Sequence, residues 1–398
     1  MEITISPHIL SGTVHAIPSK SQAHRLLICA AFADQKTHII CAETNQDIEA
    51  TVSCLRALGA DIERTESGYI VSPVTEIPSK AFLDCRESGS TLRFMLPVAG
   101  ALGIDTTFIM SGRLPQRPLS PLWEEMERMG CTLSRPTENT IHCFGRLTGG
   151  QYSIDGSISS QFITGLLFAM AILDEPCKLT ITGKIESAPY IAITRQAMEL
   201  FGVETTDLHI TSSWPFTSPG KLVVEGDWSN GAFFLGAAAI GNKLAVCGLD
   251  ANTVQGDRAA AMLIEQLDNF ITIDAADIPD LVPILSVVAG AKKGAKFINI
   301  GRLRLKESDR VQTVSAMLRQ LGANVEETED TLTVYPSRYR GCTIDSCGDH
   351  RIAMSAAIAA TIADGPVTIL KAQSVEKSYP SFWRVYQELG GNYEQHIR

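Results

Sequence analysis

The chain has 398 residues, of which 45% are hydrophobic and 20% charged, and its formal net charge is −10. This composition predicts a folded protein long enough for two domains, and it argues against intrinsic disorder and a nucleic-acid-binding surface. Because no signal-like N-terminal segment and no bilayer-length apolar run is present, we expect a cytoplasmic protein without a membrane partner.

The ten cysteines are scattered singly, and only Cys342 and Cys347 lie close together. Neither a zinc site nor a disulfide framework has this spacing. We therefore expect most of them to be core thiols in a reducing compartment.

One structural unit recurs six times along the chain: a polar cluster, an Ala-rich apolar helix, a strand, a second amphipathic helix that ends near glycine, and a further strand. The first helices recur about every 70 residues, apart from one interval of about 50. Their polar clusters begin at Ser19, Ser88, Ser159, Ser229, Pro279 and Gly348. The second helices are expected to end at Gly59, Gly130, Gly202, Gly322 and Gly390, with a degenerate copy around Asp268.

Six units divide naturally into an α/β (α+β) protein of two domains with three repeats each. The division predicts a first domain over residues 19–225 and a second over residues 226–398. Alternating segments such as 141–144 and 332–335 are expected to form half-buried strands.

The helix beginnings carry a surplus of cations. A helix N-terminus holds unpaired N–H groups and a partial positive charge, so Lys or Arg there is unfavourable unless an anion binds. Ordinary capping explains any single copy, but the repetition in an acidic protein favours phosphate or carboxylate ligands. No Walker or GxGxxG motif supports a nucleotide site. The cations are Lys20, Arg25, Arg93, Arg117, Arg304, Lys306, Arg310, Arg351 and Lys377.

Ten segments carry a family resemblance in order along the whole chain: IPSKSQAHR, ESGSTLR, GRLPQRP, DGSISSQF, ESAPYI, VEGDWSNGAFFL, IPDLVPIL, LKESDR, GDHRIAM and EKSYPSFW. Together they resemble the 5-enolpyruvylshikimate-3-phosphate synthase family, also called 3-phosphoshikimate 1-carboxyvinyltransferases. The resemblance implies two inverse α/β barrel-like domains, each of three βαβαββ repeats. It also implies that the N-terminal strand joins the second domain, which then comprises residues 1–18 and 226–398, and that the active site lies in the interdomain cleft.

The family transfers the enolpyruvyl group of phosphoenolpyruvate to the 5-hydroxyl of shikimate 3-phosphate and releases phosphate, a step toward chorismate and the aromatic amino acids. The resemblance implies these two small-molecule substrates, no metal or organic cofactor, a monomer, and domain closure around the ligand. The two substrates carry phosphates and carboxylates, which matches the anions expected from the cationic helix beginnings.

Site residues follow by position from the family motifs. The shikimate 3-phosphate set is Ser21, Arg25, Ser159, Ser160, Gln161, Ser187, Tyr190, Asp280 and Lys306. The phosphoenolpyruvate set is Lys20, Gly89, Arg117, Gln161, Arg310, Arg351 and Lys377. The catalytic set is Asp280, Glu307 and Lys20, and which of the three moves each proton stays open.

Local chemistry offers plainer interpretations for three residues near these sets. Asp280 suits an N-cap as well as a base, and His350 suits a packed position better than acid–base work. Asp309 is expected to be a structural partner of a neighbouring Arg.

The chain departs from the family pattern at two places. Glu87, Ser88, Gly89 and Ser90 stand where Asn-Ala-Gly-Thr is common, and Arg302 replaces an Asn. Because Gly89 is kept, the resemblance implies that glyphosate competes with phosphoenolpyruvate.

Two alternatives remain at this point. One is UDP-N-acetylglucosamine enolpyruvyl transferase, which typically has Lys-Asn near its start and a loop Cys, whereas this chain has Lys20-Ser21 and no Cys in SGRLPQRPL. The other is a non-catalytic anion-binding relative, against which the carboxylates among the cations argue.

Overall fold

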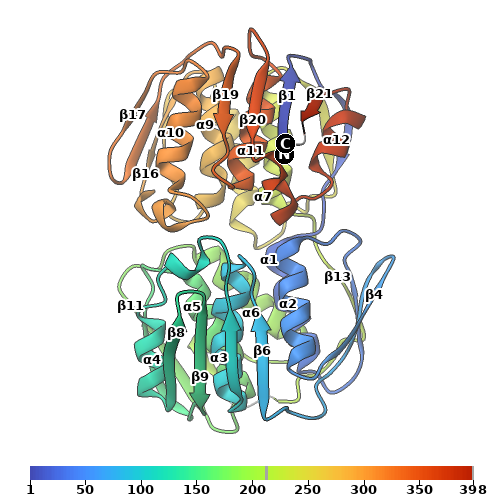
Figure 1. Ribbon diagram of the computed structural model, residues 1–398, viewed down its shortest axis with the longest axis vertical. Coiled ribbons are helices and arrows are strands. Elements are labelled where there is room, and N and C mark those ends of the chain that lie inside the picture. Colours follow the sequence, from blue (N-terminus) through green and yellow to red (C-terminus); the bar gives the residue numbers. More distant parts are fainter. Residues whose placement is uncertain (211–213, 397–398) are drawn as a thin grey trace. The chain divides into compact units, whose positions relative to one another are not determined.

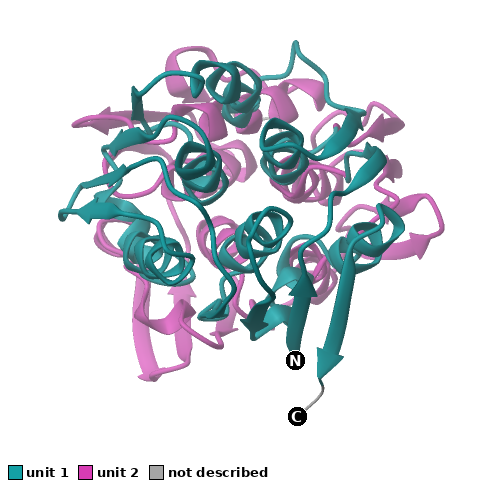
Figure 2. Ribbon diagram, turned by 90° about the horizontal axis from the view of Figure 1, so that it is seen from above, with its two compact units in different colours: residues 1–17, 226–398 teal, residues 18–225 magenta. Residues whose placement is uncertain are grey.

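The chain passes twice between two structural units, which Figure 2 distinguishes by colour. In the computed structural model, which describes residues 1–210 and 214–396, unit 1 comprises Met1–Ile17 and Gly226–Arg398, and unit 2 comprises Pro18–Glu225. In Figure 2 the helices of unit 1 are seen nearly end-on, with its strands around their outside. Unit 1 therefore buries its helices on the inner faces of its own sheets.

Unit 2 contains three sheets, each belonging to one repeat (Figure 1). The first has the strand order β13-β3-β5-β4 and comprises β3 (Thr37–Ile40), β4 (Asp61–Thr65), β5 (Gly68–Ser72) and β13 (Lys221–Val223), with α1 (Lys20–Ala31) and α2 (Gln46–Ala57). The second has the order β6-β7-β9-β8 and comprises β6 (Lys80–Asp84), β7 (Asp105–Ile109), β8 (Cys131–Thr137) and β9 (Thr140–Gly145), with α3 (Gly89–Leu102), η1 (Leu114–Gln116) and α4 (Leu122–Arg128). The third comprises β10 (Gly150–Asp155), β11 (Cys177–Thr182) and β12 (His209–Ile210), with α5 (Ser160–Ile172), α6 (Ala188–Leu200) and η2 (Thr206–Leu208).

Unit 1 repeats the plan. Its first sheet pairs β2 (Ser11–His15) with β14 (Lys243–Cys247), accompanied by α7 (Trp228–Ala239), η3 (Gly256–Arg258) and α8 (Ala259–Gln266). The second has the order β15-β16-β18-β17 and comprises β15 (Ile271–Asp274), β16 (Ala295–Ile298), β17 (Val325–Glu327) and β18 (Thr331–Val334), with η4 (Pro279–Leu281), α9 (Val282–Ala291), η5 (Gly301–Leu305) and α10 (Arg310–Gln320). The third has the order β19-β20-β1-β21 and comprises β1 (Glu2–Ser6), β19 (Cys342–Asp345), β20 (Val367–Leu370) and β21 (Asn392–His396), with α11 (His350–Ala360), η6 (Ala372–Lys377) and α12 (Phe382–Glu388).

Each complete repeat begins with two parallel strands joined through a helix. In the β6 repeat, β6 and β7 are parallel across α3, and β9 then pairs antiparallel with both β7 and β8. The β15 repeat has the same parallel and antiparallel pattern. The predicted βαβαββ repeat and the α/β fold class are confirmed.

The N-terminal strand completes a sheet built from the C-terminal end of the chain. β1 runs antiparallel to both β20 and β21, and Glu2 is opposite both Leu370 and His396. Strand β1 thus occupies the position in this sheet that β18 fills in the β15 repeat.

Side-chain caps fix the beginnings of the first helices. Ser19, Ser88 and Ser159 accept hydrogen bonds from N–H groups at the starts of α1, α3 and α5, and Asp227 and Asp349 do the same for α7 and α11. Each cap satisfies one of the N–H groups that lack an intrahelical partner. The predicted starts are therefore correct to within two residues at these five helices.

The second helices end as the glycine pattern predicted. Gly59, Gly130, Gly202, Gly322 and Gly390 all have positive φ, between 75° and 113°, directly after the last helical residues. This is the left-handed region that only glycine enters without a steric cost.

Each unit has its own hydrophobic core. In unit 1 an aromatic cluster joins α7 to α12, where the Phe382 ring lies 5.1 Å from Trp383 and 5.8 Å from Phe234. Seven of the ten cysteines are buried, which confirms the expectation of core thiols. Among the described helices, none is long and apolar enough to cross a membrane.

In unit 2 the helices α3 and α5 pack closely against each other at Gly165. A Cβ atom at Gly165 would lie 2.1 Å from the Arg93 carbonyl oxygen and 3.0 Å from the Pro97 ring. The two backbones therefore touch at this point. The crossing holds the first turns of α3 and α5 together.

We predict that Gly165→Ala destabilises unit 2 by about 1–3 kcal/mol, because the added methyl group must push the two helices apart. Urea unfolding followed by circular dichroism measures this cost, and faster hydrogen exchange in α3 and α5 locates it. Gly365→Ala is the matched control, since its Cβ would meet nothing closer than 3.5 Å. Equal stability of the two variants would contradict the prediction.

Candidate active site

The first turn of α1 begins with a buried ion pair. Lys20, the first residue of the helix, places its Nζ 2.8 Å from Asp47 Oδ2, and the two side chains are 16% and 8% exposed. Asp47 lies in the first turn of α2. The Asp47 carboxylate offsets the unfavourable interaction between Lys20 and the α1 dipole.

Arg25 is a buried cation whose hydrogen-bond partners within the described part of the chain are all neutral. Its guanidinium donates to Thr194 Oγ1 at 2.8 Å, to Thr164 Oγ1 at 3.3 Å, and to the carbonyl oxygens of Ser21 at 2.6 Å and Tyr190 at 3.1 Å. Burial lowers the pKa of Arg25 to about 10, so the group keeps its charge at neutral pH. The Arg25 side chain connects α1 to α5 and α6, and no carboxylate of the described residues forms a hydrogen bond with its positive charge.

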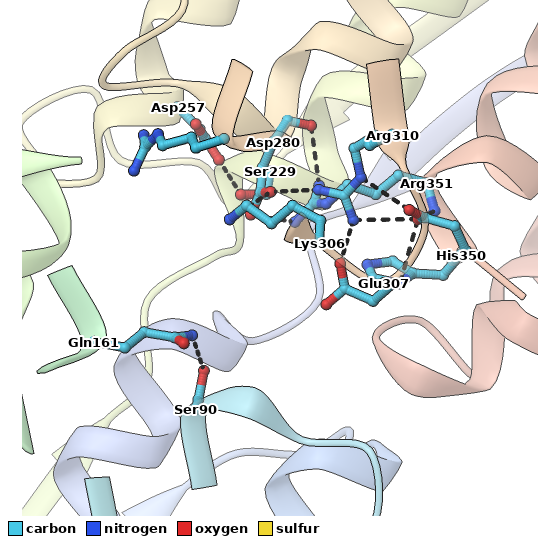
Figure 3. A network of polar contacts seen from close by, with 12 residues as sticks. Ser90, Gln161, Ser229, Asp257, Asp280, Lys306, Glu307, Arg310, His350 and Arg351 are labelled. Carbon is cyan, nitrogen blue, oxygen red and sulfur yellow. Dashed lines mark hydrogen bonds and ion pairs between the residues drawn. The ribbon is translucent and has the colours of Figure 1, made fainter. Parts of the chain in front are cut away.

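Gln161 joins the first turns of α3 and α5. Its Nε2 donates to Ser90 Oγ at 2.9 Å, and its Oε1 accepts from Arg93 Nη1 at 3.2 Å (Figure 3). Arg93 also donates to the Pro118 carbonyl oxygen. These contacts bring the serine cluster at residues 88–90 next to the cluster at residues 159–161.

Gly89 lies against two guanidinium groups. A Cβ at this position would come within 2.6 Å of Arg117 Nη1 and 2.6 Å of Arg93 Nη1. Gly89 therefore lets two guanidinium groups pack closely against the N-terminus of α3, an arrangement of positive charge suited to a small anion. Any side chain at this position would displace at least one of the guanidinium groups.

The remaining expected residues of unit 2 lie at the same helix ends. Ser159 caps α5, Ser160 is its first residue, and Ser187 precedes α6 with φ 57°, a strained conformation for serine. Tyr190 in α6 connects to Arg25 through its carbonyl oxygen. The structure thus gathers the ends of α1, α3, α5 and α6 within unit 2.

In unit 1 the central group is Arg310, the first residue of α10, which is 1% exposed. It donates from Nε to Asp349 at 2.9 Å, from Nη1 to Asp280 at 2.9 Å, and from Nη2 to Glu307 at 2.5 Å and Asp349 at 3.2 Å (Figure 3). These bonds use four of the five N–H groups of the guanidinium. Burial lowers the pKa of Arg310, but the three carboxylates outweigh burial and raise it above its ordinary value.

Asp280 is surrounded by cations. Its carboxylate accepts from Arg351 Nη2 and Arg310 Nη1, each at 2.9 Å, and lies 3.9 Å from Lys306 Nζ. Burial raises the pKa of Asp280, but Arg351, Lys306 and Arg310 together hold it well below its usual range. Asp280 is therefore a carboxylate in this state, and the N-cap interpretation is wrong because the residue lies inside η4 and makes no side-chain cap.

Lys306 is the cation of this cluster whose charge is easiest to remove. Burial, with the nearby charges of Arg302 and Arg310, lowers the pKa of Lys306 to about 8, against the opposing effect of Asp280. Arg302 donates to the Ala276 carbonyl oxygen. The replacement of the usual Asn by Arg302 thus adds a positive charge next to Lys306.

Two other residues of unit 1, Asp309 and His350, lie as local chemistry predicted, and the position of Lys377 can be described beside them. Asp309 caps α10 and binds Arg304 at 3.1 Å, which confirms its structural role. His350 is 1% exposed and packed at the start of α11. Lys377 ends η6, is 7% exposed, and lies on an element that packs against α11, the helix that carries Arg351.

The expectation that all the cations lie in first turns needs correction. Lys20, Arg310 and Arg351 do so, whereas Arg25 and Arg93 are in second turns and Arg117 follows η1. The other three lie in or beside the 3-10 turns η5 and η6. The charges still gather near helix beginnings, because side chains from neighbouring turns and loops reach the same ends.

Sequence reasoning missed the partners that hold the functional groups. Asp349 is fully buried, caps α11 and accepts a hydrogen bond from Arg310. Asp47 pairs with Lys20, and Asp257 with Ser229. The sequence does mark two of these residues, since Asp349 belongs to the GDHRIAM segment and Asp257 follows a Gln-Gly pair. Neither pattern indicates that Asp349 binds Arg310 or that Asp257 binds Ser229.

Comparison with known proteins gives one consistent family. The family described as EPSP synthase (3-phosphoshikimate 1-carboxyvinyltransferase) matches residues 5–386. The 3-phosphoshikimate 1-carboxyvinyltransferase of Clostridium perfringens strain 13 is 36% identical, with 98% of each chain covered. That of Clostridium kluyveri is also 36% identical, covering 99% of this chain and 98% of its own.

Solved structures share the fold. EPSP synthase from Acinetobacter baumannii superposes with a TM-score of 0.80 at 22% identity, covering 99% of both chains. The enolpyruvyl transferase NikO from Streptomyces tendae gives a TM-score of 0.75 at 16% identity, covering 100% of this chain and 99% of its own. The similarity therefore extends along the complete length described.

We predict that Asp349→Ala destabilises unit 1 by about 3–5 kcal/mol, because it removes one member of a buried ion pair and leaves Arg310 undercompensated. Asp309→Ala is the matched control: it also removes an N-cap aspartate bound to Arg, but at a pair that is 31% and 25% exposed, so about 1 kcal/mol is expected. Denaturant unfolding of the two variants measures the difference. A smaller loss for Asp349→Ala than for Asp309→Ala would contradict the assigned role.

Proposed function

The chain belongs to the EPSP synthase family, and from this membership we propose how the residues described above perform its reaction. The reaction moves the enolpyruvyl group of phosphoenolpyruvate to the 5-hydroxyl of shikimate 3-phosphate, giving 5-enolpyruvylshikimate 3-phosphate and phosphate. It belongs to aromatic amino acid biosynthesis. Family membership supports this reaction over transfer to a UDP-sugar and over anion binding without turnover.

Arg25 and the serines around it are proposed to bind shikimate 3-phosphate within unit 2. Four hydrogen bonds to neutral groups already fix the guanidinium of Arg25, so it loses little conformational entropy when an anion binds. Among the described residues, no carboxylate forms a hydrogen bond with it. Ser21, Ser159, Ser160, Ser187, Gln161 and Tyr190 supply neutral hydrogen-bonding groups at neighbouring helix ends. Lys306 of unit 1 is proposed to contribute a further charge.

Phosphoenolpyruvate is proposed to bind beside Gly89, Arg117 and Lys20, with Arg351 and Lys377 as further cations. Arg310 is proposed to contribute less to phosphoenolpyruvate binding than the family resemblance implied. Since four of its N–H groups already hold carboxylates, it offers the ligand one Nη1 N–H and mainly orients Glu307 and Asp280.

The observation that carries the catalytic assignment is that three cations keep Asp280 ionised, because only an ionised carboxyl group can accept the hydroxyl proton. In the addition step a base takes the proton of the 5-hydroxyl while its oxygen attacks C2 of phosphoenolpyruvate and an acid protonates the methylene carbon. In the elimination step the group that protonated the methylene carbon takes back a methyl proton as the C–O bond to phosphate breaks, and the departing phosphate receives the proton taken from the hydroxyl. We assign Asp280 to the hydroxyl proton and Glu307, acting in its protonated form, to the methylene carbon, with Lys20 as the alternative acid.

A cytoplasmic monomer acting on small molecules is proposed as the working form of the protein. The buried thiols fit a reducing compartment. Analytical ultracentrifugation of the purified protein tests the monomer.

The decisive experiment is phosphate release by the purified protein with phosphoenolpyruvate and either shikimate 3-phosphate or UDP-N-acetylglucosamine. We expect release with the first acceptor alone. If residues of both units take part in the same reaction, Arg25→Ala in unit 2 and Asp280→Asn in unit 1 should each abolish phosphate release. Release with the UDP-sugar only would overturn the proposal.

We predict that Glu307→Gln reduces kcat by at least about 100-fold while the Kd for shikimate 3-phosphate changes little, since the amide keeps the shape but cannot transfer a proton. Stopped-flow turnover and isothermal titration calorimetry measure the two quantities. Glu326→Gln, a change at a surface carboxylate, serves as control. A normal kcat for Glu307→Gln would remove the residue from the mechanism.

We predict that shikimate 3-phosphate binds more weakly as the pH rises above 8. Burial has lowered the pKa of Lys306, so this cation is present below pH 8 and is lost above it, while the substrate phosphate is already fully ionised. Titration calorimetry between pH 7 and about 9.5 measures the decline. Lys306→Arg should remove it, because Arg stays charged; a decline that persists in this variant would place the titrating group elsewhere.

A further inference from the structure

Asp257 is a buried carboxyl group that the reaction as described does not use. It lies in η3 and is 4% exposed, and its Oδ2 accepts a hydrogen bond from the hydroxyl of Ser229, in the first turn of α7 (Figure 3). Among the described residues, its buried Oδ1 has no hydrogen-bond partner. A buried carboxyl with one oxygen unsatisfied is costly and calls for a physical reason.

The charged groups around Asp257 come from three elements. Asp280 of η4 repels it most strongly, Arg351 of α11 attracts it, and Asp227 at the start of α7 repels it. Arg258, the next residue along η3, directs its guanidinium to the Ala251 carbonyl oxygen. Asp257 and Asp280 therefore share one cation, Arg351, which donates to Asp280 at 2.9 Å.

We propose that Asp257 is a positioning residue for Asp280, acting through their mutual repulsion and their shared cation Arg351. The inference rests on the proposed function, in which Asp280 receives the hydroxyl proton. Three cations hold the pKa of Asp280 too low for an effective base, since a base works best when its pKa lies near the working pH. A second carboxylate that repels Asp280 and is itself attracted by Arg351 makes Asp280 more basic.

Asp257 can change its protonation state near neutral pH, as this role requires. Burial and the nearby charge of Asp280 together raise the pKa of Asp257 to about 7, against the opposing effects of the Ser229 hydrogen bond and Arg351. Asp257 is neutral below pH 7 and ionised above it. As it ionises, the added negative charge raises the proton affinity of Asp280 and turnover increases.

The titration itself can be observed without turnover. Infrared difference spectra of the full-length protein between pH 5.5 and 8.5 should contain a protonated-carboxyl band that disappears near pH 7 and is missing in Asp257→Asn. Asp280→Asn removes the repulsion, so the band should disappear at lower pH. Ser229→Ala removes the bond that favours the ionised form, so it should disappear at higher pH.

The kinetic test uses kcat/KM for shikimate 3-phosphate between pH 5.5 and 7.5, below the range in which Lys306 titrates. Wild-type protein should gain activity through an inflection near pH 7. Asp257→Asn, which is permanently neutral, should match wild type within about twofold at pH 5.5 and fall about threefold or more behind by pH 7.5. Ser229→Ala should move the inflection to higher pH.

Several outcomes would overturn the inference. A band that does not respond to Asp280→Asn would show that the two carboxyls are not coupled, whatever the activity. If Asp257→Asn lowers kcat/KM by the same factor at every pH, Asp257 has a structural role only. If Asp257→Asn does not fold, Ser229→Ala replaces it, and an inflection that stays near pH 7 in Ser229→Ala would overturn the inference. Wild-type protein that is inactive with shikimate 3-phosphate but retains the coupled titration would overturn the proposed function alone.

Discussion

Burying a guanidinium is the constraint on which the organisation of this protein depends. Arg310 is almost fully buried, and an ion taken out of water without compensation costs several kcal/mol. Asp349, Asp280 and Glu307 supply that compensation from three different elements. The ends of η4, α10 and α11 are thereby fixed together, and the groups assigned to proton transfer are held in place by the same bonds.

The two units solve the problem of buried cations differently. Arg25 in unit 2 relies on hydroxyl and carbonyl oxygens, so its net charge is left for a ligand. Arg310 in unit 1 shares its charge with carboxylates that are themselves chemically useful. One arrangement is suited to binding an anion and the other to moving protons, and both arise from the same βαβαββ repeat.

Local signals explain which features the sequence predicted. Helix starts were located within two residues because a Ser or Asp cap satisfies unpaired N–H groups, and helix ends were located because Gly59 and its equivalents adopt positive φ. Residue assignments for the substrates came from the family resemblance alone. The pairs Lys20–Asp47 and Asp257–Ser229, each separated by 27 or 28 positions, could not be predicted because only tertiary packing brings them together.

The course of folding is constrained by strand β1. Residues 18–225 form a continuous segment, so unit 2 is complete in sequence as soon as it leaves the ribosome. Unit 1 cannot close its last sheet until β20 and β21 have been synthesised, because β1 must lie against both. During translation the backbone N–H and C=O groups of β1 therefore lack their partners in β20 and β21. Incorrect pairing of β1 with another strand is most favoured during this interval.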